Sequence, residues 1–547
     1  MALHPHDSPE LRKARGAFFT PQLVARYVTE WAVRSPTDRV LEPSCGEAAF
    51  LLEAGRRLDI LGAPSGLPGQ LNGAELHNHS ANAALSFLSQ QSYEASIAVG
   101  DFLRREPEAA YDAVIGNPPY VRYQAFSGES RAAAQRAALR AGVSLTSLAS
   151  SWAAFTVHSA LHVRPGGRLG LVLPAEMLTV NYAAPVREFL MRGFGQVRLV
   201  LFTERIFPGV MEDVVLLMAE GRGEGPTGHC ELLQTRNGET LSALVEADVR
   251  RWSPVRGERW SGALLEDEGS SAYAAAVTSG YYVPLLVWGD TTLGMVTGNN
   301  KYFTLRGEDI RRLGLQGGDV VRLSPPGSRH LRGLSLTSQA LEALDRDGSA
   351  TWLFRPAGTP SRAALRYIAA GEKTGVETAY KCRVRNPWWR VPYLRPADLL
   401  LTYMNADAAR LCTNSAGVHH LNSVHGLYLR DEHRVLGRDL LSLASLNSVS
   451  LLGSELVGRS YGGGVLKLEP READRWPMPS PELVERRQAA LRSVRRRVRD
   501  LLRAGRVFDA SEVVDEALWD GARHDLAAIR ESRALLHERR MVRSRSR

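Results

Sequence analysis

The tetrapeptide Asn117-Pro118-Pro119-Tyr120 brings together groups that could hold a planar amino group for chemistry. The side-chain oxygen of Asn117 and the backbone carbonyl of Pro118 can each accept a hydrogen bond from one amino group, and Tyr120 offers a flat face on which a ring could stack. Accepting both N–H bonds would favour a more tetrahedral nitrogen whose lone pair is available. Such a set of groups suits methyl transfer to an exocyclic amine.

The tetrapeptide directly follows a short apolar run, 111–116, that is typical of a buried strand. It therefore lies on a loop at the carboxyl end of a strand, where open α/β sheets place their chemistry. From about residue 38 to residue 220, short apolar runs alternate with helical stretches such as 80–90 and 151–163. This alternation predicts a doubly wound, mostly parallel sheet. Its strands are expected at 39–41, 71–74, 97–99, 113–115, 169–173, 197–202 and 214–218.

Three earlier strand ends also carry groups that could hold a ligand. The first strand ends in Glu42-Pro43-Ser44-Cys45-Gly46, where small residues let an anionic group approach the backbone amides of the following helix. The second strand ends at Glu75, which is positioned to hold ribose hydroxyls. The third ends in Asp101 and Phe102, an acceptor for an adenine amino group and an aromatic face for its ring. One acid at a strand end is more often a surface residue or a helix cap, but the conjunction favours a cofactor site.

In their order, these motifs resemble those of S-adenosylmethionine-dependent DNA adenine-N6 methyltransferases of the γ type, the family of TaqI-like modification methylases. That family has the cofactor motifs first, the catalytic motif next and the target-recognition domain last. Residues 16–21 resemble its N-terminal motif, and residues 204–215 resemble the segment whose aromatic residue packs on the target base. The resemblance implies catalytic roles for Asn117, Pro118, Pro119 and Tyr120, and cofactor contacts for Thr20, Glu42, Pro43, Ser44, Gly46, Glu75, Asp101 and Phe102.

The resemblance also implies a Rossmann-like sheet, S-adenosyl-L-methionine as the cofactor and double-stranded DNA as the substrate. The target adenine would leave the duplex to reach the catalytic loop, and Tyr120 and Phe207 are expected to stack on it. The reaction needs neither a metal nor a covalent enzyme intermediate, and the sequence shows no convincing metal-ligand spacing. One departure is Ala48, where many relatives have Gly, because its methyl group would narrow the approach of the cofactor.

A chain of 547 residues is too long for one ordinary core. The Gly/Pro-rich stretch 221–228 predicts a boundary after the alternating pattern. We expect a catalytic domain at 1–225, a mixed α+β target-recognition domain at 226–480 and an Arg-rich helical segment at 481–547. The formal net charge of +9 favours a polyanionic partner.

The second half is expected to choose the DNA sequence. Residues 294–303, 380–390 and 461–467 are similar to segments that recur in the family's recognition domains, and the middle one interleaves cations with aromatic residues. We therefore expect DNA contacts from Lys301, Arg383, Arg385, Trp389 and Lys467. The alternative for this region is that Trp388 or Trp389 belongs to the core and that most arginines only interact with solvent.

Three other functions compete with DNA adenine methylation. The tetrapeptide also occurs in protein-glutamine methyltransferases, and related ones occur in RNA methyltransferases, although such enzymes rarely carry so long a region after the catalytic domain. A catalytically degenerate DNA-binding subunit would keep the fold, but the intact catalytic motif and Asp101 count against it. A fused nuclease of the common metal-dependent kind needs an acid two residues before a lysine, and none of the five lysines has one. A separate cognate restriction endonuclease is the expected protein partner, if any.

The remaining bulk properties favour a cytoplasmic protein without a membrane partner. No apolar stretch approaches the ~20 residues needed to span a bilayer, and the N-terminus lacks the order of a signal peptide. The four cysteines are far apart and show no C-x-x-C spacing, which agrees with a reducing compartment.

Overall fold

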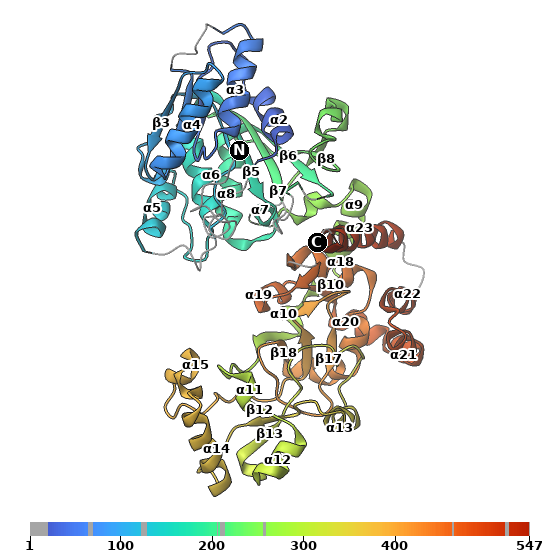
Figure 1. Cartoon of the computed structure of the whole chain (residues 1–547). Coiled ribbons are helices and arrows are strands. Elements are labelled where there is room, and N and C mark those ends of the chain that lie inside the picture. The colour runs from blue at the N-terminus through green and yellow to red at the C-terminus, as the bar shows by residue number, and fades with distance from the viewer. Residues whose placement is uncertain are drawn as a thin grey trace. The chain divides into compact units, whose positions relative to one another are not determined.

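The chain divides into two compact units, unit 1 up to Leu264 and unit 2 from Leu265 to Met541 (Figure 1). The computed structural model describes residues 20–63, 69–121, 128–204, 206–207, 214–254, 257, 259–461, 464–519 and 525–545. The predicted N-terminal motif lies outside these residues except for Thr20 and Pro21.

Unit 1 is built on a nine-stranded sheet with the order β3-β2-β1-β4-β5-β7-β6-β8-β9. Its strands are β1 (Val40–Glu42), β2 (Leu71–Glu75), β3 (Ala95–Val99), β4 (Tyr111–Gly116), β5 (Val163–Pro174), β6 (Phe194–Phe202), β7 (Val214–Arg222), β8 (Cys230–Thr235) and β9 (Arg250–Trp252). Strands β1 to β5 are parallel, whereas β7 runs antiparallel to both β5 and β6. All seven expected strands are present, and the Rossmann-like α/β fold is confirmed.

Helices cover the central strands of this sheet. They are α2 (Gln22–Ala32), α3 (Ala49–Ile60), α4 (Asn78–Gln90), α5 (Gly128–Leu139), α6 (Ser151–His162), α7 (Glu176–Thr179) and α8 (Ala184–Gly193). Helix α2 packs against α3, β4 and β5, while α6 packs against α5, α8 and the same two strands. Where helices pack on them, β4 and the second half of β5 are almost entirely buried and apolar, as is typical of parallel strands.

The boundary between the units differs from the one that the sequence predicts. Residues after 225 do not leave the sheet, because β8 pairs in parallel with β6 and β9 pairs with β8. The Gly/Pro-rich stretch instead contains the end of β7 and the reversal that follows it, where Gly221 and Gly223 have φ values of 70° and 87°. A turn inside a domain and a linker between domains have the same composition, so the sequence pattern does not distinguish them.

Within its described residues, unit 2 contains four small sheets with the orders β11-β18-β15-β17, β12-β14-β13, β16-β20-β19 and β10-β21. The strands are β10 (Tyr282–Pro284), β11 (Gly289–Leu293), β12 (Thr304–Leu305), β13 (Val320–Arg322), β14 (Trp352–Phe354), β15 (Leu399–Thr402), β16 (Met404–Asn405), β17 (Leu411–Thr413), β18 (Val424–Leu429), β19 (Arg459–Tyr461), β20 (Val465–Lys467) and β21 (Pro477–Pro479). All of their pairings are antiparallel. This mixture of short strands and helices agrees with the α+β architecture expected for the second half.

The helices of unit 2 include the Arg-rich segment that the sequence sets apart as residues 481–547. They are α9 (Asp267–Thr278), α10 (Leu285–Trp288), α11 (Asn300–Phe303), α12 (Gly307–Leu313), α13 (Ser338–Arg346), α14 (Arg362–Lys373), α15 (Tyr380–Arg383), α16 (Arg434–Leu436), α17 (Ser442–Ala444), α18 (Ser448–Val457), α19 (Pro470–Ala473), α20 (Pro481–Arg486), α21 (Gln488–Arg503), α22 (Val507–Leu518) and α23 (Leu526–Arg545). The last helices join the rest of unit 2 through buried polar contacts, since Asp515 of α22 accepts hydrogen bonds from Ser448 and Arg530.

Within the described residues, no single helix is long and apolar enough to cross a membrane. One pair of helical segments, Asp431–Ala444 and Ser448–Val457, has the required length and composition only when the two are taken together, and the pair is bent by 88°. The same residues contain no group of three or more His, Cys, Asp or Glu side chains arranged to hold a metal ion.

Candidate active site

The predicted catalytic loop follows Gly116, the last residue of β4, and its Asn side chain is fixed from two directions. The Nδ2 group of Asn117 donates to Oγ1 of Thr20 at 3.2 Å, and the hydroxyl of Tyr120 donates to Oδ1 of Asn117 at 2.7 Å. Thr20 and Tyr120 thus hold the amide of Asn117 between two hydroxyl groups. An amide oxygen can accept two hydrogen bonds, so the Tyr120 contact is compatible with a second one from a substrate.

Tyr120 is itself tied to the centre of the sheet. Its hydroxyl lies 2.9 Å from the backbone carbonyl of Val172 on β5, and its side chain is only 9% exposed. A hydroxyl has one proton, so Asn117 and Val172 share this donor. The ring therefore forms part of the unit 1 core at the position where the sequence predicts stacking on the target base.

A serine that the sequence motifs do not include holds the other end of the loop. Ser151, the first residue of α6, is buried, and its Oγ accepts from the backbone N–H of Val121 at 2.9 Å and donates to the carbonyl of Pro119. Its own backbone N–H donates to the carbonyl of Val121 at 3.0 Å. Ser151 thus fixes the backbone on both sides of Tyr120. The only sequence signal is a serine at the start of the expected helix 151–163.

The ends of β1 and β2 are joined by the acid predicted to hold ribose. The carboxylate of Glu75 accepts from the backbone N–H of Gly46 at 3.1 Å and of His77 at 3.0 Å. The turn after β1 contains two residues with positive φ, Gly46 at 47° and Ala48 at 62°. The second value is typical of glycine, since a left-handed backbone is strained for alanine.

Burial raises the pKa of two groups at the end of β1. Burial raises the pKa of the Glu42 carboxyl well above its usual value, although the backbone N–H of Leu51, which donates at 3.1 Å, lowers it. Burial likewise raises the pKa of the Cys45 thiol, with a further contribution from the nearby Glu42. Cys45 is therefore a buried neutral thiol that packs under the turn.

The two residues predicted to hold adenine occupy different environments. Oδ1 of Asp101 accepts from the backbone N–H of Leu103 at 3.0 Å, which caps the short 3-10 helix Phe102–Arg104. Phe102 is 4% exposed, and its ring centroid lies 4.9 Å from that of His158 and 5.0 Å from that of His162. Its ring therefore packs against α6, and its contact with adenine stays a prediction. Phe207 is also buried in unit 1, so stacking by this ring stays a prediction too.

His158 and His162 form a buried pair one turn apart on α6. Burial lowers the pKa of His158 to about 4, with Arg140 contributing, and lowers that of His162 to about 3, with His158 contributing. Both imidazoles are therefore neutral at neutral pH, and they fill the core beside Phe102.

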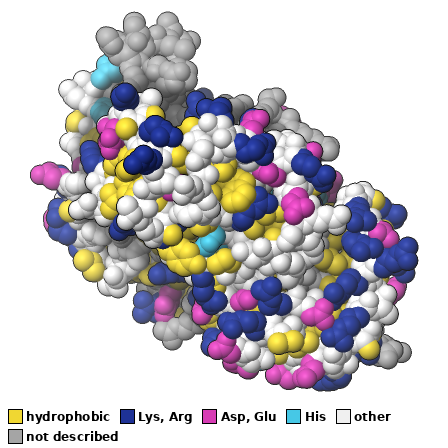
Figure 2. Space-filling view, turned by 90° about the horizontal axis from the view of Figure 1, so that it is seen from below, with side chains coloured by type: hydrophobic (Ala, Val, Ile, Leu, Met, Phe, Trp, Pro, Cys, Tyr) yellow, Lys and Arg dark blue, Asp and Glu magenta, His cyan; other side chains and the backbone are white. Residues whose placement is uncertain are grey.

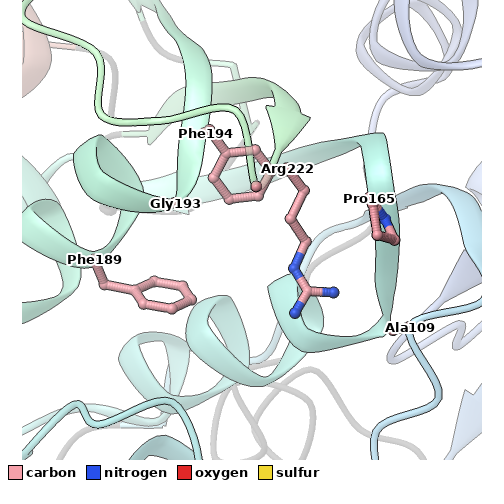
Figure 3. Close-up of a pocket in the computed structure, with 7 residues that line it drawn as sticks. Ala109, Pro165, Phe189, Gly193, Phe194 and Arg222 are labelled. Carbon is pink, nitrogen blue, oxygen red and sulfur yellow. The ribbon is translucent and has the colours of Figure 1, made fainter.

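A separate cavity of 340 Å³ lies at the opposite edge of the sheet, near the start of β5 and β6. Phe189 of α8 and Arg222 of β7 extend toward one another across it, beside Pro165 and Phe194 (Figure 3). The guanidinium of Arg222 donates to the carbonyls of Leu161 and Val163. This cavity is lined mainly by apolar groups and is distinct from the candidate active site.

Two family models match nearly successive parts of the chain. "N-6 DNA Methylase" matches residues 6–229, and "Type II methyltransferase M.Eco57I, C-terminal domain" matches residues 257–519. Among curated proteins, the Type II methyltransferase M.XamI of Xanthomonas campestris pv. amaranthicola is 25% identical over 488 residues, 85% of each chain. M.AccI of Acinetobacter calcoaceticus is 21% identical over 496 residues, 86% of each chain. The chain is an N6-adenine DNA methyltransferase of the restriction–modification type.

A solved structure extends the likeness over the whole methyltransferase. The Type IIL restriction–modification enzyme MmeI, solved in complex with DNA, superimposes with a TM-score of 0.60 and 13% identity. The match covers 97% of this chain and 80% of that one. At this identity the likeness supports the fold alone, and it includes both units.

The five residues that the sequence predicts to contact DNA lie in different environments in the structure. Lys301 and Arg383 are exposed. Arg385 donates to the backbone carbonyls of Val296 and Thr297, and Trp389 is buried in the core of unit 2. The ammonium of Lys467 lies 2.9 Å from Glu469. The structure gives the last three residues internal contacts that the sequence does not predict, and their contact with DNA stays a prediction.

Proposed function

We propose that this methyltransferase moves a methyl group from S-adenosyl-L-methionine to the N6 amino group of an adenine that has been flipped out of double-stranded DNA. The observation that carries the proposal is the hydrogen-bonded set of Thr20, Asn117 and Tyr120 at the carboxyl end of β4. It lies on the same edge of the sheet as Glu75, which ends β2, and Asp101, which follows β3; β1 lies between β2 and β4.

The residues at this edge fit the cofactor. A Cβ atom built at Gly46 or Gly100 would meet nothing within 4 Å, so there is open space beside the turns after β1 and β3. Glu75 would hold the ribose hydroxyls, Asp101 the adenine amino group, and the turn at Ser44 and Gly46 the methionine carboxylate. When bound, S-adenosyl-L-methionine supplies an activated methyl group on its sulfonium.

The chain's own residues would orient and activate the nucleophile. Oδ1 of Asn117 and the carbonyl of Pro118 would each accept one N–H of the adenine amino group. This pair of contacts would draw the lone pair out of conjugation with the ring and direct it toward the methyl group to be transferred. Since Thr20 and Tyr120 already fix the amide of Asn117, little reorganisation is needed when the base arrives.

The Asn117→Ala variant tests this proposal. It should lose methylation of DNA in a tritiated-methyl assay while calorimetry shows S-adenosyl-L-methionine binding close to that of the natural protein. The residue lies beyond the strand ends assigned to the cofactor, so the two measurements should separate. Substantial retained activity would contradict the proposed role, and offering DNA, RNA and protein to the natural enzyme would show whether DNA is the substrate.

The biological setting follows from the same proposal. As the modification enzyme of a restriction–modification or related defence system, the chain would act in the cytoplasm, where bacterial DNA lies. A separate endonuclease would recognise the same DNA site. Cleavage assays on DNA before and after methylation by this enzyme would test that partner, since methylation of the shared site should block cleavage.

A further inference from the structure

One short helix of unit 2 presents apolar and cationic side chains outward together. Tyr380 and Val384 are 65% and 62% exposed, and Lys381 and Arg383 between them are also exposed. We call these four residues the α15 surface. Helix α15 and α14 lie on one side of unit 2, away from α21 and α22 on the other (Figure 1). Figure 2 shows hydrophobic side chains between Lys and Arg side chains on one face of the molecule.

The α15 surface is firmly supported from behind. The thiol of Cys382, which is fully buried, lies 3.6 Å from the carbonyl of Thr297, and Nη1 of Arg385 donates to the same carbonyl at 2.7 Å. The backbone N–H of Val384 donates to the carbonyl of Tyr380 at 3.3 Å, so these two residues are one helical turn apart. The inward residues therefore fix the helix, and the outward residues are presented on a rigid support.

The segment that carries the α15 surface is basic. Its nearest acids are Glu377, on the 3-10 helix Val376–Thr378 that contacts α15, and Glu372 of α14, which accepts a hydrogen bond from Trp388. Residues 380–395 contain five cations and no Asp or Glu. Arg385 is engaged by backbone carbonyls, and Arg390 and Arg395 lie over the rings of Trp389 and Tyr428. Lys381 lies 5.5 Å from the exposed ring of Tyr380. The outward cations thus border the two apolar side chains directly.

This combination selects the chemistry of the partner. A single exposed apolar side chain needs no explanation, but two that lie one turn apart with two cations between them are suited to a polyanion with flat apolar groups. Duplex DNA offers both, because its phosphates attract cations and the base edges in its grooves, such as the methyl group of thymine, accept apolar contacts. An acidic protein would satisfy the charge without a reason for the exposed ring.

We propose that the α15 surface contacts the target duplex, with Tyr380 and Val384 against the bases and with Lys381 and Arg383 against the flanking phosphates. The inference rests on the proposed function, since it names the part of unit 2 that meets the DNA. It adds base contacts by Tyr380 and Val384, which the sequence motifs alone do not assign.

The experiment compares three double variants of the full chain. Tyr380→Ser/Val384→Ser removes the apolar pair, and Lys381→Gln/Arg383→Gln removes the charges. The control, Leu286→Ser/Val435→Ser, removes two exposed apolar side chains elsewhere in unit 2 that are 42% and 86% exposed. Fluorescence anisotropy at several salt concentrations gives the affinity for a duplex with the methylated motif, which sequencing of DNA modified by the natural enzyme defines. Thermal unfolding and cofactor binding check that each variant is folded.

The two variants should weaken binding in different ways. Loss of the apolar pair should reduce affinity about tenfold or more with an unchanged salt dependence. Loss of the charges should lower the slope of log affinity against log salt by about 1 to 2. Affinities of both variants within twofold of the control, from a natural enzyme that methylates DNA, would overturn the inference and leave the proposed function intact. A natural enzyme that neither binds nor methylates DNA would overturn both.

Discussion

The carboxyl edge of the unit 1 sheet and the α15 surface of unit 2 are built in opposite ways. At the sheet edge, Asn117 is fixed by Thr20 and Tyr120, and Glu75 is fixed by two backbone N–H groups. On the α15 surface, Tyr380 and Val384 project into solvent, and only the residues behind them are anchored. The difference indicates a catalytic site that is organised before DNA arrives, and a recognition surface whose contacts are completed by the DNA.

If the catalytic loop is organised in advance, removing its support should lower the rate of methyl transfer. Ser151→Ala deletes the hydroxyl that connects Pro119 and Val121. We expect kcat to fall about a hundredfold with little change in the Kd for S-adenosyl-L-methionine, because a small displacement of reacting groups is costly. Ser159→Ala is the matched control, since Ser159 is buried on the same helix. Equal effects of the two substitutions would show that Ser151 acts only through packing.

A milder substitution removes only one of the hydrogen bonds that hold the side chain of Asn117. Tyr120→Phe keeps a ring for stacking but removes the donor to Oδ1 of Asn117 and to the carbonyl of Val172. Loss of one hydrogen bond of about 1 kcal/mol predicts a kcat about five- to tenfold lower in single-turnover methylation. Tyr120→Ala, which removes the ring as well, should be far less active. If Tyr120→Phe and Tyr120→Ala were equally impaired, the hydroxyl and not the ring would be the main contribution.

The packing behind Phe102 should make unit 1 sensitive to acid. The pKa values of His158 and His162, about 4 and about 3, lie below the ordinary value of about 6.5. Both are depressed in the folded state, so the stability they support is present above about pH 6.5 and is lost as the pH falls toward their folded pKa values. Each histidine should contribute a slope of about 1.4 kcal/mol per pH unit in that window.

The His162→Leu variant should remove the contribution of His162 to the pH dependence of the free energy of unfolding. Urea unfolding at pH 7.5 and pH 5.5 should show a smaller loss of stability in the variant than in the natural protein. Identical pH dependence in His162→Leu and the natural protein would contradict the assignment.

The smallest expected effect concerns the backbone of the cofactor turn. Ala48 has φ of 62° and Ala54 lies inside α3, and both are fully buried. Glycine relieves strain at position 48 but only weakens the helix at position 54, so Ala54→Gly should destabilise the protein by about 1 to 2 kcal/mol more than Ala48→Gly. Chemical denaturation measures both. A larger loss for Ala48→Gly would show that its methyl group is needed for packing.

The sequence predicts local features well and contacts between distant segments poorly. The strands of unit 1 are recognisable because strands buried on both faces are continuous apolar runs. The bond between Thr20 and Asn117 joins residues 97 positions apart, and the contacts of Ser151 with the loop span about 30 positions, so no local pattern reveals them. Composition likewise did not show that Arg385 and Trp389 point inward while Tyr380 and Val384 point outward.

The most direct test of the account is single-molecule sequencing of unmethylated DNA after incubation with the natural enzyme and, in parallel, with Asn117→Ala. We predict N6-methyladenine at a single sequence motif with the natural enzyme and no modification with the variant. Modification of another base, modification without a sequence motif, or equal modification by the variant would contradict it.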